Sequence, residues 1–186
     1  LEAMEERRVT AEGKTYELPE PFFVIATQNP SHLIGTYPLP ESQLDRFLMR
    51  IELGYPDYNA ERTLLTGQTR QILIETLPVM LATEQLIATQ QSVSQIHASN
   101  ALLDYLQALI NYTRDSSEFQ YGLSPRAGVA LLTAAKSWAF LDNCDAVLPE
   151  DIQAVLPSIV SHRLQRREEE TNQDWIEQLI HQVAIP

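Results

Sequence analysis

The fold is decided by the stretch Phe22-Phe-Val-Ile-Ala-Thr-Gln-Asn29-Pro30, followed after a loop by Leu44-Asp-Arg46-Phe47. The continuous apolar run over residues 22–26 predicts a strand that is buried on both faces. Polar groups at the carboxyl end of such a parallel strand, here Asn29, lie where open α/β sheets bind ligands. Taken singly, Asn29 before Pro30 is more typical of a turn, and Arg46 is typical of a surface arginine whose stem packs on apolar neighbours.

Upstream of this stretch, two short β-prone arms surround Gly13 and predict a β-hairpin over residues 9–18. Gly13-Lys14-Thr15 repeats the last three letters of a P-loop, but that motif needs a glycine five positions earlier, where Arg8 stands. A P-loop also lies between a buried strand and a helix rather than at a hairpin tip. No acidic pair ends an apolar strand elsewhere in the sequence. The half of a nucleotide site that cradles the phosphates is therefore expected to be missing from this chain.

The rest of the first part is expected to hold short elements. Residues 1–7 have the pattern of the last turns of an amphipathic helix, and residues 41–47 follow a proline that suits a helix start. Residues 48–53 alternate apolar and charged side chains, as a half-buried or edge strand does. The breaker cluster over residues 54–57 then marks a domain boundary, which divides the chain into residues 1–56 and residues 57–186.

The second part has the spacing of apolar residues that is typical of amphipathic helices. Asp57, Thr83, Ser99 and Ser124 are the expected N-caps, and Pro149 is an expected first residue. The expected helices cover residues 58–70, 83–91, 100–113, 125–141, 149–164 and 174–183. Leu64 and Leu65 are expected to face inward, and Leu86 and Ile87 to be buried.

Arg126 is unusual at its position, because it follows Ser124-Pro125 in the first turn of a helix. A cation there opposes the helix dipole by about 0.3–1 kcal/mol. A helix N-terminus with an arginine is also suited to binding an anion. On the residues alone, a tolerated surface arginine and an anion-binding arginine both remain open.

Composition limits the classes of function. The net charge of −12 and a pI of about 4.7 argue against a general binder of nucleic acid or anionic membranes. The single cysteine, Cys144, excludes an intrachain disulfide framework and fits a reducing cytoplasm. No apolar stretch approaches the roughly 18 residues of a membrane span, and nothing at the start resembles a signal peptide. No histidine has a second ligand at metal spacing. Because Leu1 lies in what is expected to be mid-helix, we interpret the chain as an excised fragment of a longer protein.

The sequences VIATQNP and GTYPLPESQLDRF together resemble a region of AAA+ ATPases, and within them the MoxR family. GLSPRAG resembles the sensor 2 motif of the same family, and LEAMEER the end of the helix after its Walker B strand. The resemblance implies that Asn29 is sensor 1, which polarises the attacking water. It implies that Arg46 is an arginine finger for the neighbouring subunit's nucleotide, and that Arg126 contacts ATP phosphates. Whether Arg126 serves its own subunit or a neighbour stays open.

The implied fold is the remnant of an AAA+ core, with a hairpin, parallel strands and short helices, followed by an all-α lid domain. The implied function is Mg²⁺-dependent ATP hydrolysis in a cytoplasmic ring, expected to be a hexamer, that remodels or matures proteins with von Willebrand factor A domains. The chain alone is expected neither to bind ATP tightly nor to hydrolyse it. A non-catalytic, acidic helical interaction module is the alternative, and a nucleic-acid remodeller is a weaker third interpretation that the acidic charge disfavours.

The ATPase interpretation makes two structural demands. Residues 22–27 should lie in a sheet, and the Arg46 side chain should not be enclosed in its own hydrophobic core. Because partner strands of the core are expected to be missing, the first segment should be disturbed or should self-associate through its unpaired edge.

Overall fold

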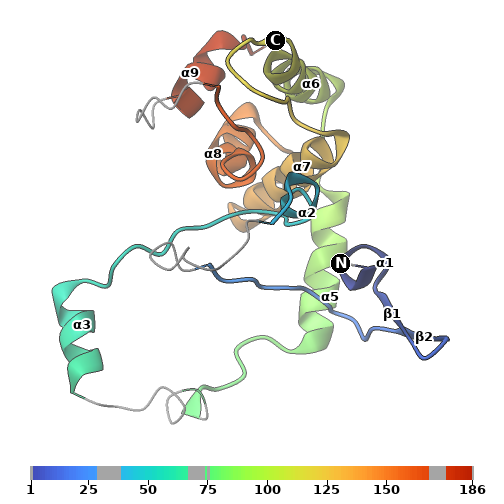
Figure 1. Ribbon diagram of the computed structural model, residues 1–186, viewed down its shortest axis with the longest axis vertical. Coiled ribbons are helices and arrows are strands. Elements are labelled where there is room, and N and C mark those ends of the chain that lie inside the picture. The colour runs from blue at the N-terminus through green and yellow to red at the C-terminus, as the bar shows by residue number, and fades with distance from the viewer. Residues whose placement is uncertain (1, 29–38, 67–73, 75, 168–174, 186) are drawn as a thin grey trace.

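A computed structural model describes residues 2–28, 39–66, 74, 76–167 and 175–185. The protein is mostly helical, with a compact group of helices and an arm that carries α3 away from it (Figure 1). The elements before the helical group are α1 (Glu2–Glu6), β1 (Arg8–Ala11), β2 (Lys14–Glu17), α2 (Glu41–Leu44) and α3 (Tyr58–Leu65). The elements that follow are α5 (Thr83–Gln95), α6 (Asn100–Asp115), α7 (Pro125–Leu141), α8 (Pro149–Val160) and α9 (Trp175–Gln182).

The predicted hairpin is confirmed. Strands β1 and β2 pair antiparallel, with Arg8 opposite Glu17 and Ala11 opposite Lys14. Gly13 has a φ of 75°, the left-handed conformation that a glycine adopts without a steric penalty. The hairpin projects from the end of α1 (Figure 1).

The predicted strand over residues 22–26 is not formed. Residues 22–28 carry no regular secondary structure, and Phe23 and Ile25 are 68% and 78% exposed. A strand exists only when a neighbouring backbone accepts and donates its hydrogen bonds. In the described part of the chain, the sheet consists of β1 and β2 alone. The segment over residues 22–28 therefore has the apolar composition of a buried strand without a partner strand, and the sheet that the ATPase interpretation demands over residues 22–27 is absent from the described residues.

The predicted strand over residues 48–53 is also wrong, for a related reason. Its residues are exposed and lie outside regular structure. The backbone N–H of Arg50 donates instead to the carbonyl of Ser158 on α8, at 2.8 Å. This contact joins the segment to a helix. Backbone groups inside a helix bond to one another, so α8 cannot form a ladder with the segment.

The core lies among α6, α7 and α8, and α9 closes one side of it. Helix α7 packs along α8, and its small residues Ala127, Ala135 and Ala139 are fully buried. Tyr105, Leu109, Leu131, Ile152, Leu156 and Ile159 are the largest buried side chains at this centre. Helix α9 is held by Leu179 and by the ring of Trp175, which meets Phe119 edge to face at 5.8 Å between centroids.

Three of the predicted N-caps are confirmed. The side chains of Asp57, Ser99 and Ser124 each accept a hydrogen bond from the backbone N–H three residues later. Thr83 is not a cap but the first helical residue of α5, since Ala82 precedes the helix. Pro149 begins α8 as predicted, after Leu148, whose side chain forms no cap.

Several predicted helix limits and burials need correction. Leu64 and Leu65 on α3 are 47% and 82% exposed, because no other element packs on this helix among the described residues. Leu86 and Ile87 are half-buried rather than buried. Helix α8 ends at Val160 rather than near residue 164, because residues 161–163 form a turn.

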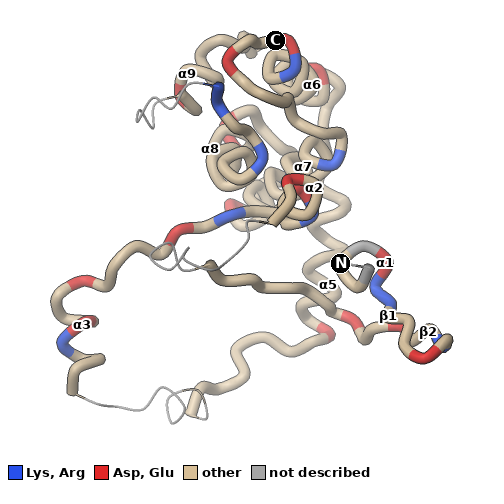
Figure 2. Tube along the Cα trace, viewed as in Figure 1, with Lys and Arg blue, Asp and Glu red and all other residues tan. Residues whose placement is uncertain are grey.

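Lys and Arg are interspersed with Asp and Glu over most elements (Figure 2). Among the described residues, no helix has the length and apolar character of a membrane span.

Candidate functional site

The predicted site residues lie in different parts of the chain. Asn29 is outside the described residues, so its predicted role is not tested. Arg46 lies in the turn that follows α2, and Arg126 is the second residue of α7. The structure brings the elements that carry Arg46 and Arg126 together.

The contact between these elements is made by Asp45, the neighbour of Arg46. Its carboxylate oxygen Oδ2 accepts a hydrogen bond from the Ser124 hydroxyl at 2.8 Å. The same oxygen lies 3.4 Å from Nη1 of Arg126. The turn after α2 is thereby attached to the N-terminus of α7, 79 positions later in the chain.

Arg163, just beyond α8, holds the same turn from the other side. Its Nε donates to Asp45 Oδ1 at 2.9 Å, and its Nη2 donates to the carbonyls of Asp45 and Phe47. Its Nη1 donates to the carbonyl of Leu48 at 3.2 Å and to that of Ile159 at 2.6 Å. All five N–H donors of a guanidinium have partners here. With its side chain 3% exposed, Arg163 is a buried clamp on the turn.

We call the four residues Asp45, Ser124, Arg126 and Arg163 the Asp45 junction. Burial by itself would raise the pKa of Asp45, but hydrogen bonds from Ser124 and Arg163 and the charges of the two arginines outweigh it and lower that pKa. Burial lowers the pKa of Arg163, and the hydrogen bond and charge of Asp45 oppose that change. Asp45 is therefore a carboxylate at neutral pH, shared by two guanidinium groups.

The junction explains how a cation is accommodated at the start of α7. The helix dipole disfavours Arg126 there, but a carboxylate at the same helix end is favoured. Asp45 occupies the N-terminal end of α7 that the sequence indicated for an external anion. Arg126 remains 49% exposed and can also contact a ligand.

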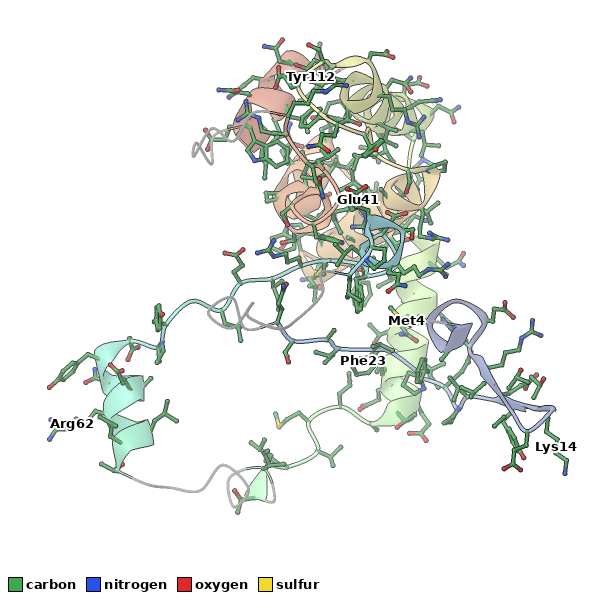
Figure 3. All side chains as sticks on the ribbon, viewed as in Figure 1. Met4, Lys14, Phe23, Glu41, Arg62 and Tyr112 are labelled. Carbon is green, nitrogen blue, oxygen red and sulfur yellow. The ribbon has the colours of Figure 1, made fainter. Side chains whose placement is uncertain are left out.

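Arg46 itself is half-buried and is not enclosed in the core. It lines a small pocket, and the other residues that line this pocket are Met4, Phe22, Phe23, Val24, Phe47 and Leu48. Met4 and Phe23 lie close together in Figure 3. The segment that was predicted as the sensor 1 strand thus lies beside the turn that carries Arg46.

His162 packs on the same turn. Its Nε2 lies 3.2 Å from the carbonyl oxygen of Phe47, and its Nδ1 is buried without a hydrogen-bond partner among the described residues. Burial and the charge of Arg163 lower the pKa of His162. His162 is consequently neutral at pH 7, with the proton on Nε2, where it can donate to Phe47.

Sequence reasoning missed Asp45 and Arg163. Asp45 stands between Leu44 and Arg46, and because most aspartates are exposed, this local pattern gives no signal of a buried ion pair. Arg163 stands between the buried residues Val160 and Leu164, one turn after Ile159. That position near a helix C-terminus suits a cation, which is the sequence signal that could have identified it.

The junction fits an anion better than a metal ion. Mg²⁺ is bound through carboxylate and water oxygens, and the carboxylate of Asp45 is already occupied by one hydroxyl and two guanidinium donors. Within the described part of the chain, no group of three or more His, Cys, Asp or Glu residues could hold a metal ion. The half-exposed guanidinium of Arg126 is suited to a phosphate oxygen.

Comparison with known proteins identifies relatives of both parts of the chain. Residues 1–49 match the family described as "ATPase family associated with various cellular activities (AAA)", and residues 111–182 match the "AAA lid domain". The chain is 44% identical over 164 residues to the uncharacterized protein YeaC of Bacillus subtilis, covering 88% of this chain and 51% of that protein. It is 36% identical to the chaperone MoxR1 of Mycobacterium tuberculosis, covering 88% of this chain and 45% of MoxR1.

A crystal structure of a candidate ATPase from Cytophaga hutchinsonii has the same fold. It superimposes with a TM-score of 0.84 at 34% sequence identity, and covers 100% of this chain and 60% of that protein. The chain spans about half the length of the curated relatives it matches.

Proposed function

Because this chain belongs to the MoxR family of AAA+ ATPases, we propose that it supplies the part of such an ATPase that senses the nucleotide and stimulates its hydrolysis. In this proposal, residues 1–56 complete an ATPase core and residues 57–186 form its lid. The observation that carries the proposal is the Asp45 junction. It joins the turn that bears Arg46 to the helix start that bears Arg126.

Each predicted site residue has one role in the proposed reaction. Asn29 orients the water that attacks the γ-phosphate of ATP. Arg46 enters the nucleotide site of a neighbouring subunit and neutralises the charge that develops on the γ-phosphate. Arg126 holds phosphate oxygens from the N-terminus of α7. Mg²⁺, bound by other parts of the ATPase, supplies further positive charge on the phosphates.

The rate acceleration provided by an arginine finger is much larger, in free energy, than the stability provided by an exposed ion pair. An arginine finger accelerates phosphoryl transfer by about 10³–10⁵-fold, which corresponds to about 4–7 kcal/mol of barrier. An exposed ion pair contributes only about 0–1 kcal/mol to stability. Since Arg46 is half-buried and is not part of the core, its mutation should affect turnover far more than folding.

A finger that acts on a neighbour requires an oligomer. We propose a ring, expected to be a hexamer, in which each subunit completes the next subunit's active site. The ring remodels or matures partner proteins in the cytoplasm, and von Willebrand factor A domain proteins are the proposed clients. The chaperone MoxR1 supports a remodelling role, because it is a named chaperone among the relatives.

The test uses the longer ATPase that, on this proposal, combines this chain with a P-loop. Arg46→Ala should lower kcat by about 10³-fold or more, because the finger charge is lost, while ATP affinity changes little. Arg50→Ala is the matched control, since Arg50 is an exposed arginine that pairs with Glu52 nearby. Normal turnover in the Arg46→Ala protein would remove Arg46 from the mechanism. ATP hydrolysis by residues 1–186 alone would contradict the proposed division of the active site.

The alternative is a non-catalytic, acidic helical module that binds other proteins. It needs only the amphipathic helices, and treats Asn29, Arg46 and Arg126 as ordinary residues. A gene without a P-loop and an acidic strand end upstream of this sequence would favour it.

A further inference from the structure

We propose that Asp45 and Arg163 are positioning residues for the proposed finger, Arg46. In this proposal they attach the turn over residues 45–48, which we call the finger turn, to the lid, so that the turn and the lid move together. The inference rests on the proposed function of Arg46. It adds two residues to which the proposed function gave no role: Asp45, which stands beside Arg46 in LDRF, and Arg163, which lies outside the quoted motifs.

The finger turn has little structure of its own. Helix α2 spans four residues and has no side-chain cap at its start. A helix this short is not stable in isolation, because nucleation costs more than its few hydrogen bonds return. The local backbone bonds in the turn include those from the N–H groups of Asp45, Arg46 and Phe47 to carbonyls of α2. Contacts from outside α2 must therefore hold Arg46 in place.

Arg163 makes those contacts on both sides of Arg46. It donates to the carbonyls of Asp45, Phe47 and Leu48, so the backbone before and after Arg46 is fixed. Arg163 is itself fixed to α8 by the carbonyl of Ile159. Because a guanidinium is planar and its donors have a fixed geometry, this clamp sets the direction of the turn as well as its distance from α8.

Asp45 connects the same clamp to α7. One carboxylate oxygen accepts from Arg163, and the other accepts from Ser124 and faces Arg126. Removing the charge of Asp45 would leave Arg163 buried without its counter-charge, which weakens the clamp on the α8 side as well. The carboxylate of Asp45 thus connects the turn both to α7 and, through Arg163, to α8.

The consequence for an ATPase is mechanical. A rotation of α7 and α8 carries Asp45 with it, and Arg46 is the next residue. Lid position and finger position are therefore not independent. A lid that moves when the nucleotide changes would insert or withdraw the finger that serves the neighbouring subunit.

The first experiment measures whether the clamp holds the turn, using hydrogen exchange of residues 1–186. Arg163→Lys should speed exchange of the Arg46 and Phe47 amides by about tenfold or more, as expected for lost charge-assisted hydrogen bonds. Lysine keeps the charge but cannot reach the same set of carbonyls. The matched control is Arg167→Lys, since Arg167 also donates to a backbone carbonyl, that of Phe119. Equal exchange in the two variants would overturn the proposal.

The second experiment is a double-mutant cycle in the longer ATPase. Asp45→Asn keeps the side-chain shape and should lower kcat by about 10–100-fold, because a small misplacement of a catalytic group has that effect. In the Arg46→Ala background, Asp45→Asn should lower kcat no further, since no finger remains to be positioned. The control is Asp104→Asn, an exposed aspartate on α6.

The outcomes separate this inference from the proposed function. Multiplicative losses from Asp45→Asn and Arg46→Ala would overturn the positioning role, and so would normal kcat in Asp45→Asn beside an inactive Arg46→Ala protein. Normal kcat in Arg46→Ala would instead overturn the finger itself.

Discussion

Ser124 bonds through its side chain to both Ala127 and Asp45. Its oxygen accepts the N–H of Ala127 at 3.0 Å as the N-cap of α7, and its hydrogen is donated to Asp45 at 2.8 Å. The same hydroxyl that begins the helix therefore also docks the turn that carries Arg46. A residue that sequence reasoning assigns to local structure serves tertiary structure as well.

Replacing Ser124 with alanine should reduce stability more than the loss of an ordinary cap. A lost N-cap costs about 1 kcal/mol, and a lost hydrogen bond to a charged group costs about 1.5–3 kcal/mol. The expected fall in the free energy of unfolding is therefore about 2–4 kcal/mol, measured by urea denaturation. Ser99→Ala is the matched control, because Ser99 caps α6 but bonds to no carboxylate among the described residues. If the two variants lose equal stability, the bond to Asp45 contributes nothing.

The lowered pKa of His162 predicts a loss of stability in mild acid. Burial and the charge of Arg163 lower this pKa in the folded protein, and the carbonyl of Phe47 and the charge of Asp45 oppose the change only in part. In the unfolded chain the group titrates near its ordinary value of 6.5. As the pH falls through 6.5, the unfolded state takes up a proton before the folded state does. The free energy of unfolding should therefore decrease below that pH, and level off once the folded protein is also protonated.

The measurement is urea denaturation of residues 1–186 at several values between pH 7.5 and about pH 5, where carboxylates titrate little. His162→Gln should flatten the dependence, because the amide does not titrate. His181→Gln should retain it, since His181 is exposed on α9. An unchanged slope in His162→Gln would assign the effect to another group.

Local signals in the sequence predicted the helices well, whereas elements that depend on pairing with distant residues were not predicted correctly. Asp57, Ser99 and Ser124 cap their helices as predicted, since a cap needs only the next three residues. The strand over residues 22–26 failed because its hydrogen bonds must come from another strand. The burial predicted from the apolar run was also wrong, since Phe23 and Ile25 are exposed, because burial depends on a partner that a short window of sequence cannot supply.

The same limit applies to the candidate site. The sequence and its family resemblance indicated Arg46 and Arg126. Arg126 contacts the carboxylate of Asp45, and Arg46 is the next residue after Asp45. Asp45 and Arg163 lie 118 positions apart, and no periodic pattern relates them. Arginines at helix ends are common on protein surfaces, so only the fold distinguishes Arg163, with its buried guanidinium, from its exposed neighbour Arg167.

Gly122, in the loop before α7, is expected to tolerate no side chain. A Cβ there would lie 2.5 Å from Cγ and 2.6 Å from Cα of Arg114, at the end of α6. Because a backbone atom cannot move aside easily, Gly122→Ala should lower the free energy of unfolding by about 1–3 kcal/mol. The adjacent Leu123 N–H bonds to the buried Thr113 hydroxyl, which fixes the loop against α6.

Gly128 provides the matched comparison for this substitution. A Cβ at Gly128 would lie 2.7 Å from Cδ1 of Ile110, which is the end of a flexible side chain. The gain in helix propensity, about 1 kcal/mol, should offset much of the cost of moving that methyl group. Gly128→Ala should therefore stay close to the wild-type stability in thermal unfolding. Equal effects of the two alanine variants would contradict the close approach of the loop to α6.

The last prediction concerns which nucleotide Arg126 serves in the proposed ring. Arg46 is proposed to act on a neighbouring subunit, and Asp45, the residue beside it, lies against Arg126. Arg46 follows Asp45 in the chain, and Arg126 contacts the carboxylate of Asp45, so the two arginines are expected to approach the same nucleotide. We therefore predict that Arg126, like Arg46, completes the site of the neighbour.

Mixed rings of the longer ATPase test this prediction. Subunits with Arg126→Ala are mixed with subunits whose P-loop lysine is replaced, each inactive in a ring of its own kind. If Arg126 acts on the neighbour, the P-loop variant lends its intact arginine to a subunit that binds ATP, so turnover reappears on mixing. Mixing Arg46→Ala with the same P-loop variant is the positive control and should recover in parallel. Recovery with Arg46→Ala but not with Arg126→Ala would place Arg126 at its own subunit's nucleotide. Arg46 and Arg126, on either side of Asp45, would then act on nucleotides of two different subunits.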